Sequence, residues 1–144
     1  MSPKLYNRQE KIECLIAKLV EESKRGTPIV VEGKKDAANL ERLGVEGKIV
    51  TAKTGGKNFS DVLSEIETLK TRDIILFLDF DRRGREGTKR FNAELEHLRI
   101  KTNMWFWREL QGLINRDIQC IESLPHYLPE LLKFTHIIRF LSVI

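Results

Sequence analysis

The sequence predicts an α/β protein with a central, mainly parallel four-stranded sheet flanked by helices, an N-terminal helix and a helical C-terminal tail. Three observations lead to this fold class. Short runs of β-branched and aliphatic residues recur along the chain, stretches with apolar residues at helical spacing separate them, and two of the runs end in acidic residues. Continuous apolar runs are typical of parallel strands buried on both faces, and their alternation with helices favours right-handed crossovers.

Length and composition favour one domain that spans residues 1–144. Hydrophobic residues make up 41% of the chain and charged residues 32%, as in globular proteins and unlike disordered ones. We divide the domain into an N-terminal helix at 4–26, a core at 27–109 and a helical C-terminal extension at 110–144. No leader sequence opens the chain, and no apolar run approaches the roughly 20 residues that span a bilayer. We therefore expect a cytoplasmic protein that does not contact membranes.

The elements follow in order along the chain. Asn7 and Glu10 have the spacing of a capping box, and apolar residues at helical spacing then lead to Gly26, which predicts the first helix. Strands are predicted at Ile29–Val31, Lys48–Lys53, Ile74–Leu78 and Met104–Trp107. Helices are predicted at Ala37–Leu43, from Ser60 or Asp61 to Lys70, and after Gly87 to about Leu98. From Leu110 onward the pattern is helical, with breaks at Pro125 and Pro129.

Acidic residues follow two of the predicted strands. Glu32 comes directly after the first strand, and Asp79 and Asp81 come at the end of the third. Ligands of open α/β sheets bind beyond the carboxyl ends of the strands, so we expect these three carboxylates at one site. Alternation along a strand would point Asp79 and Asp81 the same way and Phe80 the opposite way. Oxygen ligands suit Mg²⁺, with Mn²⁺ as the alternative, so Glu32, Asp79 and Asp81 are the predicted metal ligands.

Basic residues cluster near the same strand ends. The chain has 25 basic residues and a net charge of +4, which permits a polyanionic partner. Nine of the 25 lie at or just after predicted strand ends: Lys34, Lys35, Lys53, Lys57, Arg82, Arg83, Arg85, Lys89 and Arg90. Those assigned to phosphate or nucleic-acid binding are Lys34, Lys35, Lys57, Arg82, Arg83 and Arg85. The expected partner is a nucleic acid, either DNA or RNA.

Two segments carry a resemblance to a known family. The residues Val31-Glu32-Gly33-Lys34-Lys35-Asp36 and Leu78-Asp79-Phe80-Asp81-Arg82-Arg83-Gly84 resemble, in order and strand context, the two motifs of the Toprim family. This family includes domains of topoisomerases, bacterial primases and the ribonuclease that matures a small ribosomal RNA. The resemblance covers roughly Pro28–Trp107, and it is greatest to small stand-alone Toprim proteins of archaea and bacteria. It implies the Toprim, Rossmann-like, fold.

The resemblance also implies roles for the acidic residues. In the family, a glutamate after the first strand acts as general acid or base or joins the metal shell, and two aspartates hold magnesium. Those roles fall on Glu32, Asp79 and Asp81. Topoisomerases continue the aspartate motif with a Gly-Glu pair, whereas Arg85 separates Gly84 from Glu86 in this chain. We therefore assign Glu86 no metal-binding role.

Three functions remain open at this point. The first is Mg²⁺-dependent phosphoryl transfer on nucleic-acid phosphodiester bonds, as in a nuclease. The second is a non-catalytic, metal-binding module that docks on nucleic acid or on a larger processing complex. The third is a phosphatase of the haloacid-dehalogenase type with Asp79 as nucleophile, although that motif normally lies near the N-terminus and Arg83 occupies a position usually held by Thr or Val.

Other residues receive structural interpretations. Cys14 and Cys120 lack metal-ligand spacing, which predicts core thiols. The segment Gly55-Gly56-Lys57 lacks the upstream glycine of a nucleotide-binding loop and is interpreted as a plain loop. Trp105 and Trp107 are expected in the core of a strand rather than as base-stacking platforms. The apolar stretch Phe134–Ile144 is expected to form a packed helix or a homodimer surface.

Overall fold

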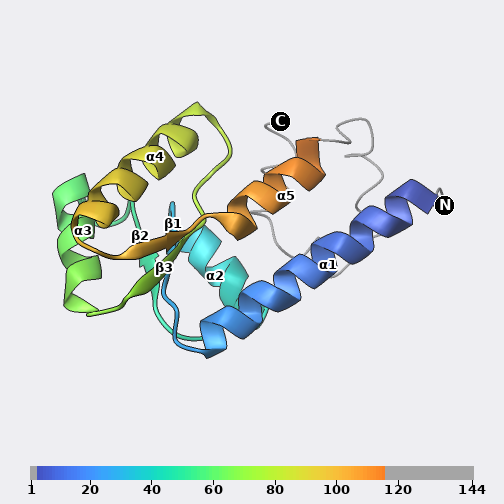
Figure 1. The fold of residues 1–144 in the computed structure, drawn as a ribbon, viewed down its shortest axis with the longest axis horizontal. Helices are drawn as coiled ribbons and strands as arrows, with labels where there is room; N and C mark the ends of the chain where they lie inside the picture. The colour runs from blue at the N-terminus through green and yellow to red at the C-terminus, as the bar shows by residue number, and fades with distance from the viewer. Residues whose placement is uncertain (1–2, 116–144) are drawn as a thin grey trace.

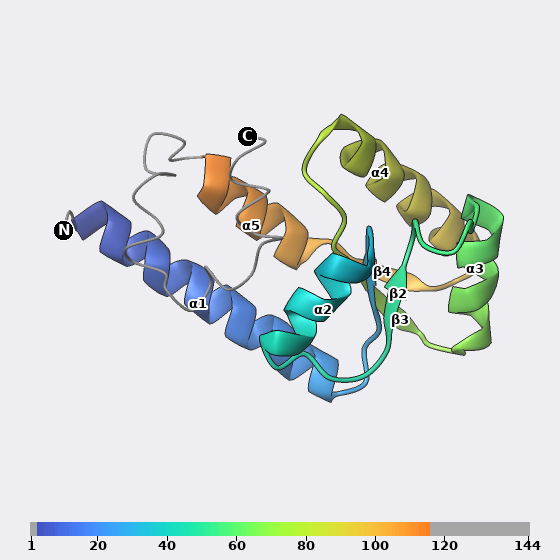
Figure 2. The same cartoon turned by 180° about the vertical axis from the view of Figure 1, so that it is seen from behind.

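The computed structural model describes residues 3–115 of the chain (Figure 1). The elements are, in order, α1 (Pro3–Lys24), β1 (Ile29–Val31), α2 (Lys34–Arg42), β2 (Ile49–Thr51), α3 (Phe59–Thr68), β3 (Asp73–Leu76), α4 (Arg82–His97), β4 (Lys101–Asn103) and α5 (Trp105–Asn115). The strands lie at the centre and the helices on both sides of them (Figures 1 and 2).

The four strands form one parallel sheet in the order β2-β1-β3-β4. Ile29 of β1 pairs with Ile49 of β2 on one side and with Ile75 of β3 on the other, and Asp73 of β3 pairs with Lys101 of β4. All three pairings are parallel. The α/β fold class predicted from the sequence is therefore confirmed.

Each face of the sheet is covered by helices. Ile29 and Val31 of β1 belong to a core with α1, α2 and α5, whereas Val30 between them belongs to a second core with α3 and α4. In β3, Ile75 faces the first core and Ile74 the second. Burial on both faces explains why these strands are continuous apolar runs rather than alternating patterns.

The fourth predicted strand, Met104–Trp107, is wrong. The strand β4 ends at Asn103, and the helix α5 begins at Trp105. The side-chain oxygen of Asn103 accepts a hydrogen bond of 2.9 Å from the backbone N–H of Trp105, which starts the turn. Phe106 and Leu110, four residues apart on one helix face, are both buried in the first core. The aromatic residues at 105–107 thus follow the burial pattern of a helix, although aromatic residues are typical of a strand.

Several helix boundaries also differ from the prediction. α1 begins at Pro3, so Asn7 lies within the helix and the expected capping box there is wrong. α2 begins at Lys34 instead of Ala37, because a carboxylate oxygen of Asp36 accepts a hydrogen bond of 3.1 Å from the backbone N–H of Gly33, the capping residue.

Cys14 is exposed, contrary to the expected core thiol. Cys14 lies on α1 directly before the buried Leu15, and neighbouring positions of a helix can face the solvent and the core, respectively. The predictions for Cys120, for Phe134–Ile144 and for the rest of the C-terminal extension fall outside the described residues. Within residues 3–115, no helix has the length and apolar character needed to cross a membrane.

Candidate metal and phosphate site

Glu32 and Asp79 follow the ends of two adjacent parallel strands. Glu32 comes directly after β1, and Asp79 comes shortly after β3. The pairing of these strands continues past β3, because the backbone N–H of Phe77 donates a hydrogen bond of 2.9 Å to the backbone oxygen of Val30. The structure therefore brings the two acidic segments to the same edge of the sheet, as the sequence predicts.

Glu32 is buried and has a cationic partner. Only 8% of its surface is exposed. Its Oε2 lies 3.0 Å from Nζ of Lys53, a residue that follows β2. The backbones of the same two residues are also joined, because the N–H of Lys53 donates to the oxygen of Glu32 at 2.9 Å. This partner offsets part of the free energy that burial of a carboxylate costs.

Residues 77–81 form what we call the acidic loop. Strand alternation does not place its two aspartates, because β3 ends at Leu76 and Phe80 is buried in the same core as Phe77. Asp79 is half-buried, whereas Asp81 is exposed. Asp79, Phe80 and Asp81 therefore lie after the strand, so the premise that strand alternation orients them is wrong.

Asp81 caps the N-terminus of α4. Its Oδ1 accepts a hydrogen bond of 2.7 Å from the backbone N–H of Gly84. The helix continues from there, because the N–H of Arg85 donates to the backbone oxygen of Asp81 at 2.9 Å. Capping fixes the direction of the Asp81 side chain at the start of α4.

Two side chains hold the backbone of the acidic loop. The indole Nε1 of Trp107 donates a buried hydrogen bond of 2.8 Å to the oxygen of Leu78. The Nη1 of Arg85 donates to the oxygen of Phe80 at 3.1 Å. Sequence reasoning missed the first of these contacts. A signal was available, since a buried indole N–H nearly always has an acceptor.

Gly84 allows α4 to approach Asp79 closely. A Cβ atom at this position would lie 1.9 Å from the backbone oxygen of Asp79 and 2.6 Å from its carbonyl carbon. Any other residue would push the acidic loop and α4 apart, because both atoms belong to the backbone. Gly84 therefore sets the position of Asp79 relative to the helix.

The donors match Mg²⁺ in type. Glu32, Asp79 and Asp81 offer only carboxylate oxygens, which hard divalent cations prefer. Over residues 3–115, however, no three Asp, Glu, His or Cys side chains are grouped closely enough to hold a metal ion. The sequence-predicted ligands thus share a sheet edge without forming a compact triad, and their role as ligands stays a prediction.

Cations surround the N-termini of two helices at this edge. Lys34 and Lys35 lie exposed in the first turn of α2, and Arg82, Arg83 and Arg85 lie exposed in the first turn of α4. The first turn of α4 has no acidic residue. Helix N-termini attract anions through their N–H groups and dipole, and these cations add to that attraction.

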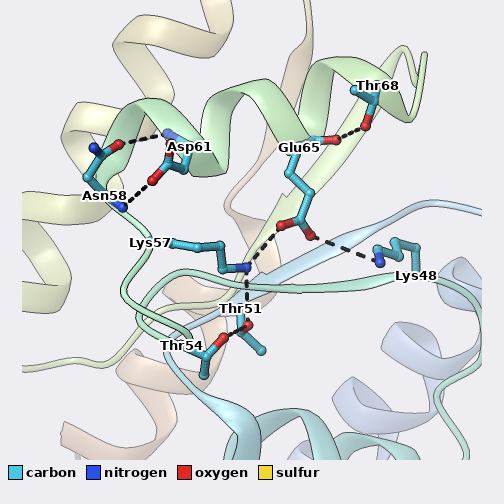
Figure 3. Close-up of polar contacts among 8 residues, drawn as sticks. All are labelled: Lys48, Thr51, Thr54, Lys57, Asn58, Asp61, Glu65 and Thr68. Carbon is cyan, nitrogen blue, oxygen red and sulfur yellow. Dashed lines mark hydrogen bonds and ion pairs between the residues drawn. The ribbon is translucent and has the colours of Figure 1, made fainter.

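Lys57 has partners on α3 and β2 instead of at the acidic residues. Its Nζ lies 2.9 Å from Oε1 of Glu65 on α3 and 3.4 Å from the hydroxyl oxygen of Thr51 (Figure 3). The hydroxyls of Thr51 and Thr54 also bond to each other. The loop before α3 is thus held internally, and the structure does not bring Lys57 to the acidic residues as a free cation.

Glu86 and Arg90 also have local partners. Oε1 of Glu86 lies 3.1 Å from Nε of Arg82, and both side chains are exposed. The guanidinium carbon of Arg90 lies 3.9 Å from the centre of the Phe59 ring, which places Arg90 toward α3. Arg90 therefore points away from the cations predicted to cluster near the strand ends, and Glu86 interacts with Arg82, one of those cations.

Comparisons with known proteins identify the family of this chain. A model of the Toprim domain matches residues 26–103. UPF0292 protein MJ1624 from Methanocaldococcus jannaschii is 40% identical over 124 residues, or 83% of this chain and 94% of the relative. A UPF0292 protein from Methanosarcina acetivorans is 31% identical over 86% of this chain and 84% of its own length.

A solved structure shows the same fold. That structure is described as a putative protein from Aquifex aeolicus, and it superposes on this protein with a TM-score of 0.59 at 24% sequence identity. The superposition covers 68% of this chain and 86% of the Aquifex chain. The Toprim match indicates a metal-dependent function related to nucleic acids, and Toprim domains generally bind Mg²⁺. The chain therefore belongs to the Toprim domain family, with UPF0292 proteins as its relatives over most of its length.

Proposed function

We propose that this protein hydrolyses phosphodiester bonds in nucleic acid in a Mg²⁺-dependent reaction. One observation carries the proposal: Glu32 and Asp79 follow neighbouring strand ends, and the basic N-termini of α2 and α4 begin at the same edge of the sheet. Carboxylates for a cation and N–H groups for an anion thus lie next to each other. Phosphoryl transfer needs both.

Each residue has an assigned role in this proposal. Asp79 and Asp81 would hold Mg²⁺, or Mn²⁺ in its place, with Glu32 at the same edge of the sheet. The bound metal would supply charge neutralisation at phosphate oxygens and a more acidic water. Glu32 acts as the general base: it accepts a proton from the attacking water on Oε1, since its Oε2 pairs with Lys53. Lys34 and the first turn of α4 hold the phosphate.

The experiment measures cleavage of labelled single- and double-stranded DNA and RNA in Mg²⁺, Mn²⁺ or EDTA. Asp79→Asn and Glu32→Gln are compared with wild type, and Asp73→Asn is the matched control because Asp73 is an exposed acid at the opposite end of β3. We expect metal-dependent cleavage that falls at least about a hundredfold in the first two variants and persists in the control. Cleavage that continues in EDTA, or in folded Asp79→Asn, would contradict the proposal.

A second candidate is a metal-binding module that docks on nucleic acid or on a larger processing complex without turnover. The absence of a compact carboxylate triad within residues 3–115 favours it. Calorimetric Mg²⁺ binding that is lost in Asp79→Asn, with no cleavage of any of the four substrates, would support this module over the hydrolase. The Toprim match argues against the haloacid-dehalogenase alternative. Of the three candidate functions, only that alternative predicts covalent trapping of Asp79 by a phosphate mimic.

A further inference from the structure

A groove lies between α4 and the beginning of α5. Its volume is about 480 Å³. Its cationic lining residues are Arg82, Arg85, Lys89 and Arg108, and its acidic lining residue is Glu86. We propose that this groove binds the phosphodiester backbone of a nucleic-acid strand and leads that strand to the acidic loop. The inference rests on the proposed function and names where its substrate binds.

The α4 wall carries three cations on one helix face. Arg82, Arg85 and Lys89 follow each other at spacings of three and four residues, which places them on one side of the helix. At 1.5 Å per residue they extend over roughly 10 Å, the length over which one strand of a duplex rises by about three nucleotides at 3.4 Å of helix axis each. The row thus has the dimension of a strand segment rather than of one small anion.

The α5 wall adds Arg108, which sequence reasoning did not identify. Arg108 and Lys89 are both exposed, and neither forms an ion pair with another residue of the described part of the chain. Arg82 pairs with Glu86, but exposed pairs of this kind contribute little and exchange readily. The groove therefore holds an excess of available positive charge.

The groove has a fixed apolar floor and fixed walls. Trp107 and Met104 line it, and Trp107 is buried. On the α4 side, the hydroxyl of Thr88 donates to the oxygen of Gly84 at 2.7 Å. The side chain of Asn92 is hydrogen-bonded to Thr102 of β4. Figure 2 shows α4 and α5 on either side of the end of β4, which joins the two walls.

The groove lies against the acidic loop. Two of its lining residues hold that loop directly: Arg85 donates to the oxygen of Phe80, and Trp107 donates to the oxygen of Leu78. A strand that follows the cations of α4 therefore reaches the helix start, where Asp81 is the capping residue. The groove thus lies next to the acidic loop, at the start of α4.

Exposed cations favour a polyanion over a small phosphate compound. A strand gains affinity from many weak contacts and releases counterions at each one, so solvent-exposed Lys and Arg are sufficient. A small phosphate ligand would need enclosed, convergent donors instead. The groove offers an open row of cations and therefore fits the strand.

The test measures fluorescence anisotropy of labelled 20-nucleotide single-stranded DNA and RNA, and of duplexes, in EDTA over a series of salt concentrations. The groove variant is Lys89→Ala with Arg108→Ala. The matched control is Lys24→Ala with Arg42→Ala, two exposed cations in the last turns of α1 and α2. Each double variant lowers the formal net charge of +4 by two and keeps the same residue types. Melting curves establish that both variants are folded.

We expect the groove variant to bind a single strand about tenfold or more weakly at low salt, with a salt slope smaller by about 1.4, the value for two phosphate contacts. The control should bind within about twofold of wild type. An equal loss in both variants, or a loss in neither, would overturn the groove. If wild type binds duplex more tightly than a single strand, and the groove variant loses the same affinity for duplex, the groove inference stands and the substrate is double-stranded.

This test and the cleavage test fail separately. Binding in EDTA does not need the metal, so Asp79→Asn should bind as wild type does. If wild type cleaves but the groove variant binds normally, the groove inference is wrong and the hydrolase stands. If the groove variant loses binding but wild type never cleaves, the hydrolase is wrong and the groove stands.

Discussion

The indole Nε1 of Trp107 lies 2.8 Å from the backbone oxygen of Leu78, the residue before Asp79, and the bond is buried. It joins the helix after the last strand to the loop after the third strand, 29 residues earlier in the chain. The position of the acidic loop therefore depends on a side chain that belongs to neither Toprim motif.

Trp107→Phe should destabilise the protein and loosen this loop. The change leaves the buried oxygen of Leu78 without its donor, which costs about 1–3 kcal/mol. We expect a lower urea midpoint and weaker Mg²⁺ binding by calorimetry. The control is Trp105→Phe, because Trp105 is 44% exposed and should change stability by less than about 0.5 kcal/mol. Equal stability of both variants would argue against the role of this bond.

Gly84→Ala should displace the acidic loop. Its methyl group would lie 1.9 Å from the oxygen of Asp79, so backbone must move, at a cost of about 3 kcal/mol or more. Gly112→Ala on α5 is the control, because nothing lies within 4 Å of its added Cβ. Alanine there should leave the protein as stable as wild type, or more stable by up to about 1 kcal/mol. Urea unfolding and Mg²⁺ calorimetry measure both, and a Gly84→Ala protein with wild-type stability and metal affinity would refute the assignment.

Asp81 serves two purposes that substitutions can separate. Asp81→Asn keeps an oxygen that accepts from Gly84 but removes the charge, so stability should change by only a few tenths of a kcal/mol. Asp81→Ala also removes the cap and should cost about 1 kcal/mol. Both should lower Mg²⁺ affinity about tenfold or more if Asp81 is a metal ligand. Undiminished Mg²⁺ binding by folded Asp81→Asn would leave Asp81 as a cap alone.

Lys53 and Lys57 make a matched pair for testing which lysine serves the site. Lys53 pairs with Glu32, whereas Lys57 pairs with Glu65. Lys53→Met should lower the cleavage rate about tenfold, because Glu32 loses the partner that orients it. Lys57→Met should leave cleavage and strand binding within about twofold of wild type and cost less than about 1 kcal/mol. A larger loss of strand binding in Lys57→Met would restore Lys57 to the phosphate-binding set.

The sequence predicts the two central strands, β1 and β3, well because they are buried on both faces. A short apolar run between two helical segments, such as Ile29–Val31, is typical of a buried parallel strand. The acidic residues at the ends of these runs indicate the edge of the sheet where a ligand binds. The sequence also places Glu32 and Asp79 together, since adjacent parallel strands end at one edge.

The sequence predicts the last described helix poorly. Aromatic residues at Trp105 and Trp107 are typical of a strand, and only the wider spacing of Phe106, Leu110 and Leu113 indicates a helix. Because the sequence predicts a strand at Met104–Trp107, it indicates neither Arg108 as a groove residue nor the indole bond to Leu78. Contacts of this kind depend on tertiary packing between distant segments, which local spacing does not encode.

Two of the helices that cover the first face of the sheet, α1 and α5, lie outside the Toprim match at 26–103. Leu19 of α1 and Leu110 of α5 are buried in the core that contains Ile29 and Ile75. A fragment cut at the matched limits would expose this face and should aggregate. During synthesis at about 5–20 residues per second, the nascent sheet also stays uncovered for seconds until α5 leaves the ribosome. Completion of the described core therefore waits for α5, and chaperones that shield apolar surface have their opportunity before it.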